Sequence, residues 1–283
     1  MAGALPGAFR IAGAGLPFQT KRNLNLFKTD EASMGFKDHF SDVSADYARA
    51  RPGYPAELFE YLAGLAPGRQ RAWDCATGTG QAAAGLSGWF DEVRATDASR
   101  NQIDNARPVQ NIQYSVSPAE NTPFPANFFD LVNVSTALHW FDMEKFYGEV
   151  RRVTRPGGIL AVYAYTLFKI SPDLDRIIKA GIFDPIEDYW PPERKIIDDE
   201  YRTIPFPFEE VDPPEFSIAM DWSFSDLQAY LGTWSAVRNF EKTQGEGPLN
   251  EAMKKLRAAW GSAGARRSVS MELFMRVGRV FPN

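Results

Sequence analysis

Apolar and polar positions along the middle of the chain follow two different periods, and the two periods alternate. Helical spacing places the apolar side chains of residues 143–153 on one face, and Pro156-Gly157 is expected to end that helix. Short apolar runs without such spacing predict strands at residues 71–74, 93–96, 112–116, 128–136 and 159–165. Alternation of this kind is typical of a parallel sheet with helices on both faces.

The pattern changes in the second half of the chain. From Ser171 to Arg267 prolines cluster, and helical runs cover residues 225–237 and 249–260. Residues 269–280 then alternate as a strand does, and we expect this strand to rejoin the sheet, antiparallel and at its edge. The expected fold is therefore α/β: a Rossmann-like, doubly wound, mostly parallel sheet with an antiparallel last strand and a helical insertion over its C-terminal edge.

Composition narrows the classes of function to consider. The net charge is −5, which argues against a nucleic-acid partner, and the longest apolar run, residues 159–168, is too short to span a membrane. The single cysteine, Cys75, excludes an intrachain disulfide and fits a reducing, cytoplasmic setting. With one cysteine and two histidines no metal site is expected. A chain of 283 residues suits one large domain, as a monomer or a homodimer.

The stretch RAWDCATGTG, residues 71–80, carries the strongest chemical signal. An apolar run ends at Asp74, a turn of small residues follows, and a helix is expected from Gln81, which is a common way to hold a nucleotide-like cofactor. Residues 78–83 also satisfy a loose G-x-G-x-x-A pattern, so a dinucleotide stays open. Asp74 favours S-adenosyl-L-methionine (SAM), because a carboxylate would repel a pyrophosphate and attract an ammonium group.

Further motifs follow in order along the chain. They are ATDAS ending the next strand at Asp97, SPAENTPF at 117–124, FDLV at 129–132, ALHWFD at 137–142 and RPGG at 155–158. With DCATGTG they resemble the class I SAM-dependent methyltransferases. Residues 47–55, 188–190 and 230–235 resemble the trans-aconitate methyltransferase group, so the likeness extends from Met34 to the C-terminus. One departure is Ala76, where the family usually has glycine.

The resemblance implies a set of residues that hold the cofactor. Asp74 would bind the ammonium group, Asp97 the ribose hydroxyls, and Ala119 the adenine through its backbone, with Arg51 pairing the carboxylate. As alternatives, Asp97 could cap a helix and Glu120 could be a solvated loop charge. The cofactor set is Asp74, Ala76, Gly78, Gly80, Asp97, Ala98, Ala119, Glu120, Thr136, Tyr47 and Arg51.

Residues for the methyl acceptor are expected after the fourth strand and in the insertion. His139 is the candidate catalytic residue, although a lone histidine is often structural, and Trp140 would form a wall of the pocket. Arg194, with Lys195 and Arg202 nearby, suits a carboxylate. Aromatic residues at helical spacing are usually core, which is the alternative for Trp234. The substrate set is Trp140, Tyr189, Trp190, Arg194 and Trp234.

The resemblance also divides the chain. A methyltransferase domain is expected at residues 34–283, with its core at 67–168 and 269–283, a lid over the cofactor at 34–66 and a substrate-covering insertion at 169–268. Residues 1–33 are rich in Gly and Ala, and we favour an N-terminal extension or arm over a targeting segment.

The function expected from these features is SAM-dependent methylation of a small molecule, with a carboxylate oxygen as acceptor. A carboxylate is ionised at neutral pH and needs no base. The alternatives are a hydroxyl or carbon acceptor with His139 as base, an NAD-dependent oxidoreductase, and a non-catalytic SAM-binding protein.

Overall fold

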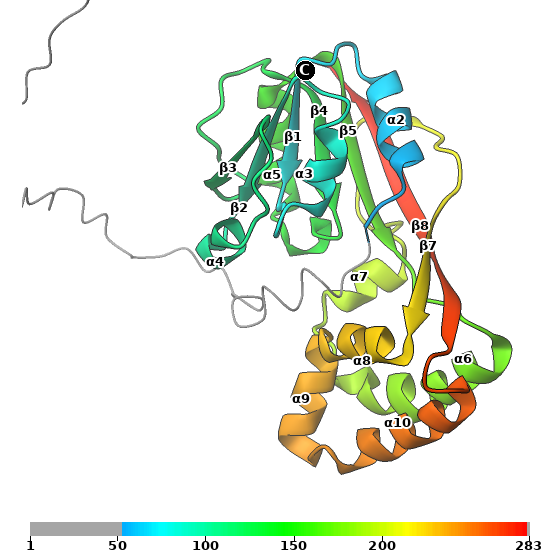
Figure 1. Cartoon of the computed structure of the whole chain (residues 1–283). Coiled ribbons are helices and arrows are strands. Elements are labelled where there is room, and N and C mark those ends of the chain that lie inside the picture. Colours follow the sequence, from blue (N-terminus) through cyan, green and yellow to red (C-terminus); the bar gives the residue numbers. More distant parts are fainter. Residues whose placement is uncertain (1–52, 282–283) are drawn as a thin grey trace, which may run out of the picture. The chain divides into compact units, whose positions relative to one another are not determined.

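An eight-stranded sheet organises residues 53–281, the part of the chain that this computed structural model describes (Figure 1). The strand order is β3-β2-β1-β4-β5-β8-β6, and β7 also pairs with β8. The first five strands are parallel to one another, as the sequence predicts. Their bounds are β1 Arg71–Cys75, β2 Glu92–Asp97, β3 Ile112–Val116, β4 Phe129–Ser135 and β5 Thr154–Tyr165.

Helices cover both faces of this sheet. Side chains of a strand point alternately to its two faces, so neighbouring residues of β4 enter different apolar clusters. Leu131 packs in the cluster that includes Leu62 and Leu86, whereas Val132 packs in the cluster that includes Phe146 and Val150. The doubly wound arrangement is thereby confirmed. The helices concerned are α2 Ala56–Leu65 and α3 Gln81–Leu86 on one face and α5 Met143–Val153 on the other, while α4 Arg100–Asp104 links β2 to β3.

The last strand is antiparallel, as expected, but it is not at the edge. β8, Arg266–Val280, pairs with β5 on one side. On its other side it pairs with β6, Glu209–Val211, and β7, Phe216–Ser223, which the sequence analysis missed. The prediction that the last strand lies at the edge is therefore wrong. The sequence analysis missed β6 and β7 because the prolines around them are not expected within a strand.

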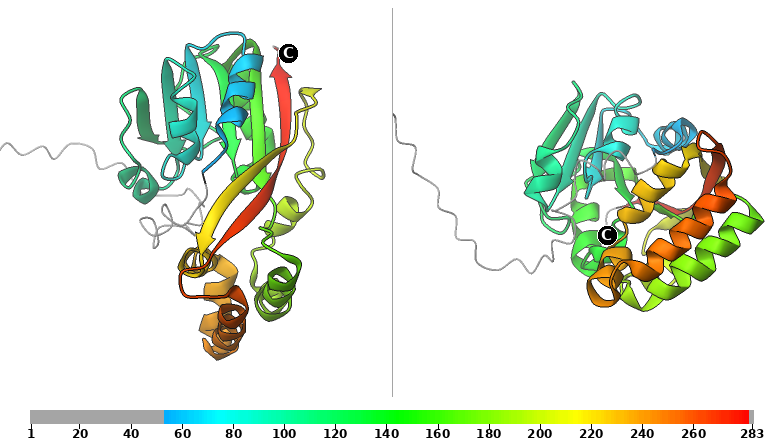
Figure 2. Two further views of the ribbon diagram at one scale, coloured as in Figure 1. Left: turned by 45° about the vertical axis from the view of Figure 1, so that its right-hand side comes forward. Right: turned by 60° about the horizontal axis from the view of Figure 1, so that its bottom comes forward.

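Helices after β5 gather beyond the end of the sheet where β5 ends and β8 begins (Figures 1 and 2). They enclose an apolar cluster of their own, built around residues such as Trp234 and Trp260. The predicted helix at 225–237 is interrupted at Thr233–Trp234. The elements are α6 Pro172–Ile178, the π-helical turn η3 Lys179–Phe183, the 3-10 turn η4 Asp184–Tyr189, α7 Arg194–Asp198, α8 Phe224–Gly232, α9 Ser235–Gln244 and α10 Gly247–Trp260.

Among residues 53–281, no helix is both long enough and apolar enough to cross a membrane. The expected extension, residues 1–33, and most of the expected lid lie outside the described residues, as do the predicted cofactor contacts Tyr47 and Arg51.

Candidate active site

The turn between β1 and α3 is built from left-handed backbone. Ala76, Gly78 and Gly80 have φ values of 53°, 57° and 91°. A Cβ at Gly80 would overlap the hydroxyl of Tyr114, so this position needs glycine for space as well as for its φ. The turn thus forms with alanine at position 76, where the family usually has glycine.

Asp74 ends in a buried position at the base of this turn. Its side chain is 0% exposed, and its carboxylate accepts hydrogen bonds from Asn133 Nδ2 at 2.7 Å and from the hydroxyl of Thr77. Burial raises the pKa of Asp74 to about 6, while these two hydrogen bonds oppose the rise. No cationic side chain of residues 53–281 forms an ion pair with it. A buried carboxylate held by neutral donors is suited to the ammonium group of a ligand.

Asp97 joins the turn to the start of α4. Its carboxylate accepts from the backbone N–H of Gly78 at 2.9 Å and from that of Ser99 at 2.8 Å. Ser99 is the residue that caps α4, because its hydroxyl accepts from the N–H of Gln102. The ribose role of Asp97, and contact through Ala98 beside it, remain predictions.

The turn after β3 holds the residues predicted to meet adenine. Ser117 N–H donates to the carbonyl of Asp97 at 3.0 Å, which aligns this turn with the end of β2, and Ala119 is 7% exposed. Glu120 accepts from the backbone N–H of Asp142 at 3.1 Å, at the start of α5. Glu120 therefore has a structural role that the sequence analysis did not anticipate, and its contact with the cofactor remains a prediction.

Thr136 follows β4 in a strained conformation. Its φ is 54°, which is unusual for a β-branched residue and costs energy that the surrounding structure must compensate. Its N–H donates to the carbonyl of Tyr163 at 2.7 Å, and its hydroxyl lies 3.2 Å from that of Tyr54. The parallel strands β2 and β4 flank β1, so their carboxyl ends lie at the same edge of the sheet. Thr136, Asp74 and Asp97 therefore lie at that edge.

His139 lies in the 3-10 turn η2, Leu138–Trp140, directly after this edge. It is 8% exposed, its ring centroid is 4.9 Å from that of Trp140, and its Nδ1 lies 3.3 Å from the hydroxyl of Tyr201. Burial lowers the pKa of His139 to about 3, and the positive charge of Arg194 contributes. The imidazole is therefore neutral over the physiological range. Tyr201 was not among the predicted residues.

The insertion brings two of its predicted residues together. The guanidinium of Arg194 lies 4.6 Å from the ring centroid of Trp190, and Arg194 also pairs with Asp198 at 2.8 Å. The indole N–H of Trp190 is buried and has no hydrogen-bond partner within the described chain. Since Arg194 also acts on the pKa of His139, these three side chains define one region.

Two other predicted substrate residues have packing roles. The ring of Tyr189 contacts that of Phe240 at 5.1 Å, and its hydroxyl accepts from Gln244 on α9. Trp234 is 3% exposed and belongs to the apolar cluster of the helical insertion. Contact of either residue with an acceptor remains a prediction. Across the same described residues, no group of three or more His, Cys, Asp or Glu is placed to bind a metal ion.

A Rossmann-like sheet with a carboxylate and a glycine turn at its ligand-binding edge is typical of enzymes that bind a nucleotide-like cofactor. Comparison with known proteins identifies the class of enzyme. The family described as "Methyltransferase domain" matches residues 73–162. A Dictyostelium discoideum protein assigned as a methyltransferase is 34% identical over 229 residues, which cover 80% of this chain and 87% of that one.

A solved structure and a partial relative agree with this. The structure, assigned as a type II methyltransferase from Anaeromyxobacter dehalogenans, is 39% identical, has a TM-score of 0.78, and is matched over 82% of this chain and 99% of that one. The Yersinia pestis ubiquinone/menaquinone biosynthesis C-methyltransferase is 34% identical over 39% of this chain and 47% of its own length.

The chain belongs to the class I SAM-dependent methyltransferases. It is an enzyme, and SAM is its methyl donor. This assignment decides between SAM and the dinucleotide that the glycine pattern by itself left open.

Proposed function

We propose that this enzyme transfers the methyl group of SAM to a carboxylate oxygen of a small molecule. The observation that carries the proposal is a guanidinium, Arg194, that lies over Trp190 and whose charge helps to keep the nearby His139 neutral. Guanidinium groups recognise carboxylates through charge-assisted hydrogen bonds. The resemblance of residues 47–55, 188–190 and 230–235 to the trans-aconitate methyltransferase group also favours an acidic substrate.

The residues at the edge of the sheet fit the methyl donor. Asp74 would bind its ammonium group and Asp97 its ribose, while the turn at 76–80 would approach it through backbone. Ala119 would contact the adenine. When bound, SAM supplies a methyl group already activated by the sulfonium, so the protein has to orient the acceptor and exclude water.

The transfer itself needs no proton to move. An oxygen lone pair of the acceptor carboxylate forms the new C–O bond, and the electron pair of the breaking C–S bond stays on sulfur. A carboxylate has a pKa near 4 and is ionised at neutral pH, so no general base is required. A histidine whose pKa is about 3 suits this chemistry, because it would be a weak base in any case.

A hydroxyl or carbon acceptor is the second candidate. It is favoured by the Yersinia pestis relative, which is a C-methyltransferase. In that mechanism His139 would take a proton from the acceptor. Burial and Arg194 both oppose protonation of His139, which is why we favour the carboxylate.

Product chemistry can separate the two candidates. The enzyme would be incubated with methyl-labelled SAM and a panel of small carboxylic acids, each paired with the alcohol of the same skeleton. A methyl ester releases labelled methanol in mild base, whereas an ether or a C-methyl product does not. We expect base-labile product from acids, and base-stable product confined to the alcohols would contradict the proposal.

Arg194→Gln provides the test of recognition. Loss of a charge-assisted hydrogen bond of about 1.5–3 kcal/mol should raise the KM for the acid by about one to two orders of magnitude. Arg176→Gln is the matched control, because Arg176 is 75% exposed on α6 and pairs with Asp173. Its KM should equal that of the wild type.

A further inference from the structure

The turn before β6 carries unusual backbone strain around a buried tyrosine. Glu200 and Tyr201 are consecutive non-glycine residues with φ values of 52° and 58°. Such conformations are unfavourable for residues other than glycine and persist where the surrounding structure fixes them. Tyr201 is nevertheless 0% exposed, so the turn is built to hold its side chain inside the protein.

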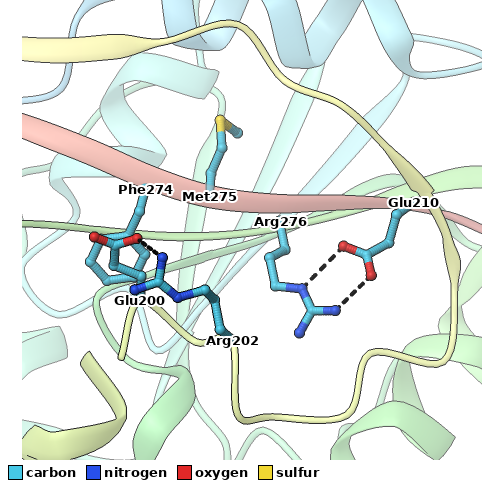
Figure 3. Close-up of a pocket in the computed structure, with 6 residues that line it drawn as sticks. All are labelled: Glu200, Arg202, Glu210, Phe274, Met275 and Arg276. Carbon is cyan, nitrogen blue, oxygen red and sulfur yellow. Dashed lines mark hydrogen bonds and ion pairs between the residues drawn. The ribbon is translucent and has the colours of Figure 1, made fainter. Parts of the chain in front are cut away.

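Arg276 of β8 is the residue that fixes this turn. Its Nη1 donates to the carbonyl of Tyr201 at 3.2 Å and to that of Ile204 at 2.6 Å. Its other nitrogens form a two-point pair with Glu210 of β6, at 3.1 and 2.6 Å (Figure 3). Phe206 lies beneath the guanidinium at 4.6 Å. Arg276 thus ties the turn to the sheet through four hydrogen bonds.

A cavity of about 360 Å³ lies beside this arginine, lined by Glu200, Arg202, Glu210, Phe274, Met275 and Arg276 (Figure 3). Both of its cations are already paired, Arg276 with Glu210 and Arg202 with Glu200 at 3.0 Å. Because Arg276 also donates to two backbone carbonyls of the turn, we assign it a role in holding Tyr201.

The hydroxyl of Tyr201 lies where it can influence which ring nitrogen of His139 carries the hydrogen. Burial raises the pKa of its hydroxyl well above the usual value, so the O–H is retained. Within residues 53–281, the acceptor found for this O–H is His139 Nδ1, at 3.3 Å. A buried hydroxyl donates wherever an acceptor is in reach. If Nδ1 accepts, the hydrogen of the neutral imidazole must be on Nε2.

We propose that Tyr201 is a positioning residue that holds His139 as the Nε2–H tautomer, so that His139 donates a hydrogen bond to the methyl acceptor instead of taking its proton. The donor role rests on the proposed function; the tautomer does not. Arg194 and the Nε2–H would then each bind an oxygen-bearing group of the acceptor, which leaves the attacking oxygen unprotonated and free.

Ring-nitrogen NMR of the protein without acceptor tests the tautomer directly. The chain has two histidines, His39 and His139, so His139→Asn assigns the signals. We expect wild-type His139 to carry hydrogen on Nε2 and to stay unprotonated down to about pH 5. Hydrogen on Nδ1 of His139 in the wild type would overturn the proposal.

Tyr201→Phe removes the donor and keeps the ring. We expect the Nδ1 signal to shift and the two tautomers to become mixed, while KM for the acceptor rises about threefold to tenfold. Tyr189→Phe is the control, because that hydroxyl contacts α9 and should leave the His139 signals unchanged. Unchanged His139 signals in Tyr201→Phe would refute the proposal. Base-stable product with an intact Nε2–H tautomer would instead refute the carboxylate acceptor alone.

Discussion

At the scale of single residues, Asp74 of the candidate site is a buried carboxylate whose negative charge does not favour folding. Asp74 is a fully buried carboxylate whose hydrogen-bond donors are neutral. Asp130, by contrast, is a buried carboxylate that pairs with Arg155 and accepts from two backbone N–H groups. We propose that Asp74 binds a ligand, whereas the contacts of Asp130 are those of a structural residue.

This difference predicts opposite effects of the same substitution. The pKa of Asp74 in the folded protein is about 6, above its usual value of 3.8, so folding favours the protonated form. Its contribution to stability is therefore largest below about pH 4 and is lost as the pH rises to about 6. Asp74→Asn should not lower the melting temperature of the SAM-free protein at pH 8, and it should remove this pH dependence. SAM affinity should fall by about one to two orders of magnitude, as measured by calorimetry.

Asp130→Asn is the control for that experiment. It should lower the melting temperature, because the guanidinium of Arg155 loses its partner, while SAM affinity stays unchanged. If Asp74→Asn destabilises the protein as much as Asp130→Asn does and still binds SAM normally, Asp74 is a structural residue.

At the scale of elements, the turn between β1 and α3 keeps its shape at some cost. Ala76 has φ 53°, a conformation that costs an L-residue roughly 1–2 kcal/mol, whereas glycine adopts it freely.

Ala76→Gly should therefore stabilise the protein by about 0.5 kcal/mol, once the greater entropy of glycine in the unfolded chain is subtracted. Ala84→Gly in α3 is the matched control and should cost about 1 kcal/mol, because Ala84 is helical and exposed. Urea unfolding measures both. A loss of stability in Ala76→Gly comparable to that of the control would mean that the turn is not strained at Ala76.

The sequence predicts the first four strands well. β3 matches its predicted range although it is an outer strand with mostly exposed side chains, and β1, β2 and β4 match within two residues, because turn-forming residues bound these short runs. The helix at 143–153 also ends where its apolar spacing ends, before Pro156. β6 and β7 escaped prediction because β6 has three residues and both lie among prolines.

The site residues also fall into two groups: those that the sequence alone indicates and those that it does not. Asp74, Asp97 and Thr136 could be singled out from the sequence because each lies at or just after the carboxyl end of a strand. Asn133 lies inside the apolar run of β4, and Tyr201 is 62 residues beyond His139 in the chain. Their roles depend on tertiary pairing, and a single sequence does not contain that information.

At the scale of the whole described chain, the candidate site lies where separate apolar clusters meet. Tyr201 and Ile204 pack in a cluster of the sheet, whereas Trp190 packs in the cluster of the helical insertion. Tyr54 contacts both the insertion cluster and the other sheet cluster. Among the described residues, those proposed to hold SAM therefore come from the sheet, and those proposed for the acceptor come largely from the insertion. Such a division would let one methyltransferase fold serve acceptors of different chemistry.

The measurement that tests the account most directly is the maximal rate of methyl transfer as a function of pH, for the wild type and for His139→Asn, with a saturating acceptor from the panel. The account predicts a rate that is flat from about pH 6 to about pH 9, since a carboxylate is already ionised. His139→Asn should change the KM more than the rate, because in this account His139 binds the acceptor and takes no proton from it. A wild-type rate that rises through an ionisation, together with a loss on the order of 10²–10⁴ in His139→Asn, would contradict it and identify His139 as a general base.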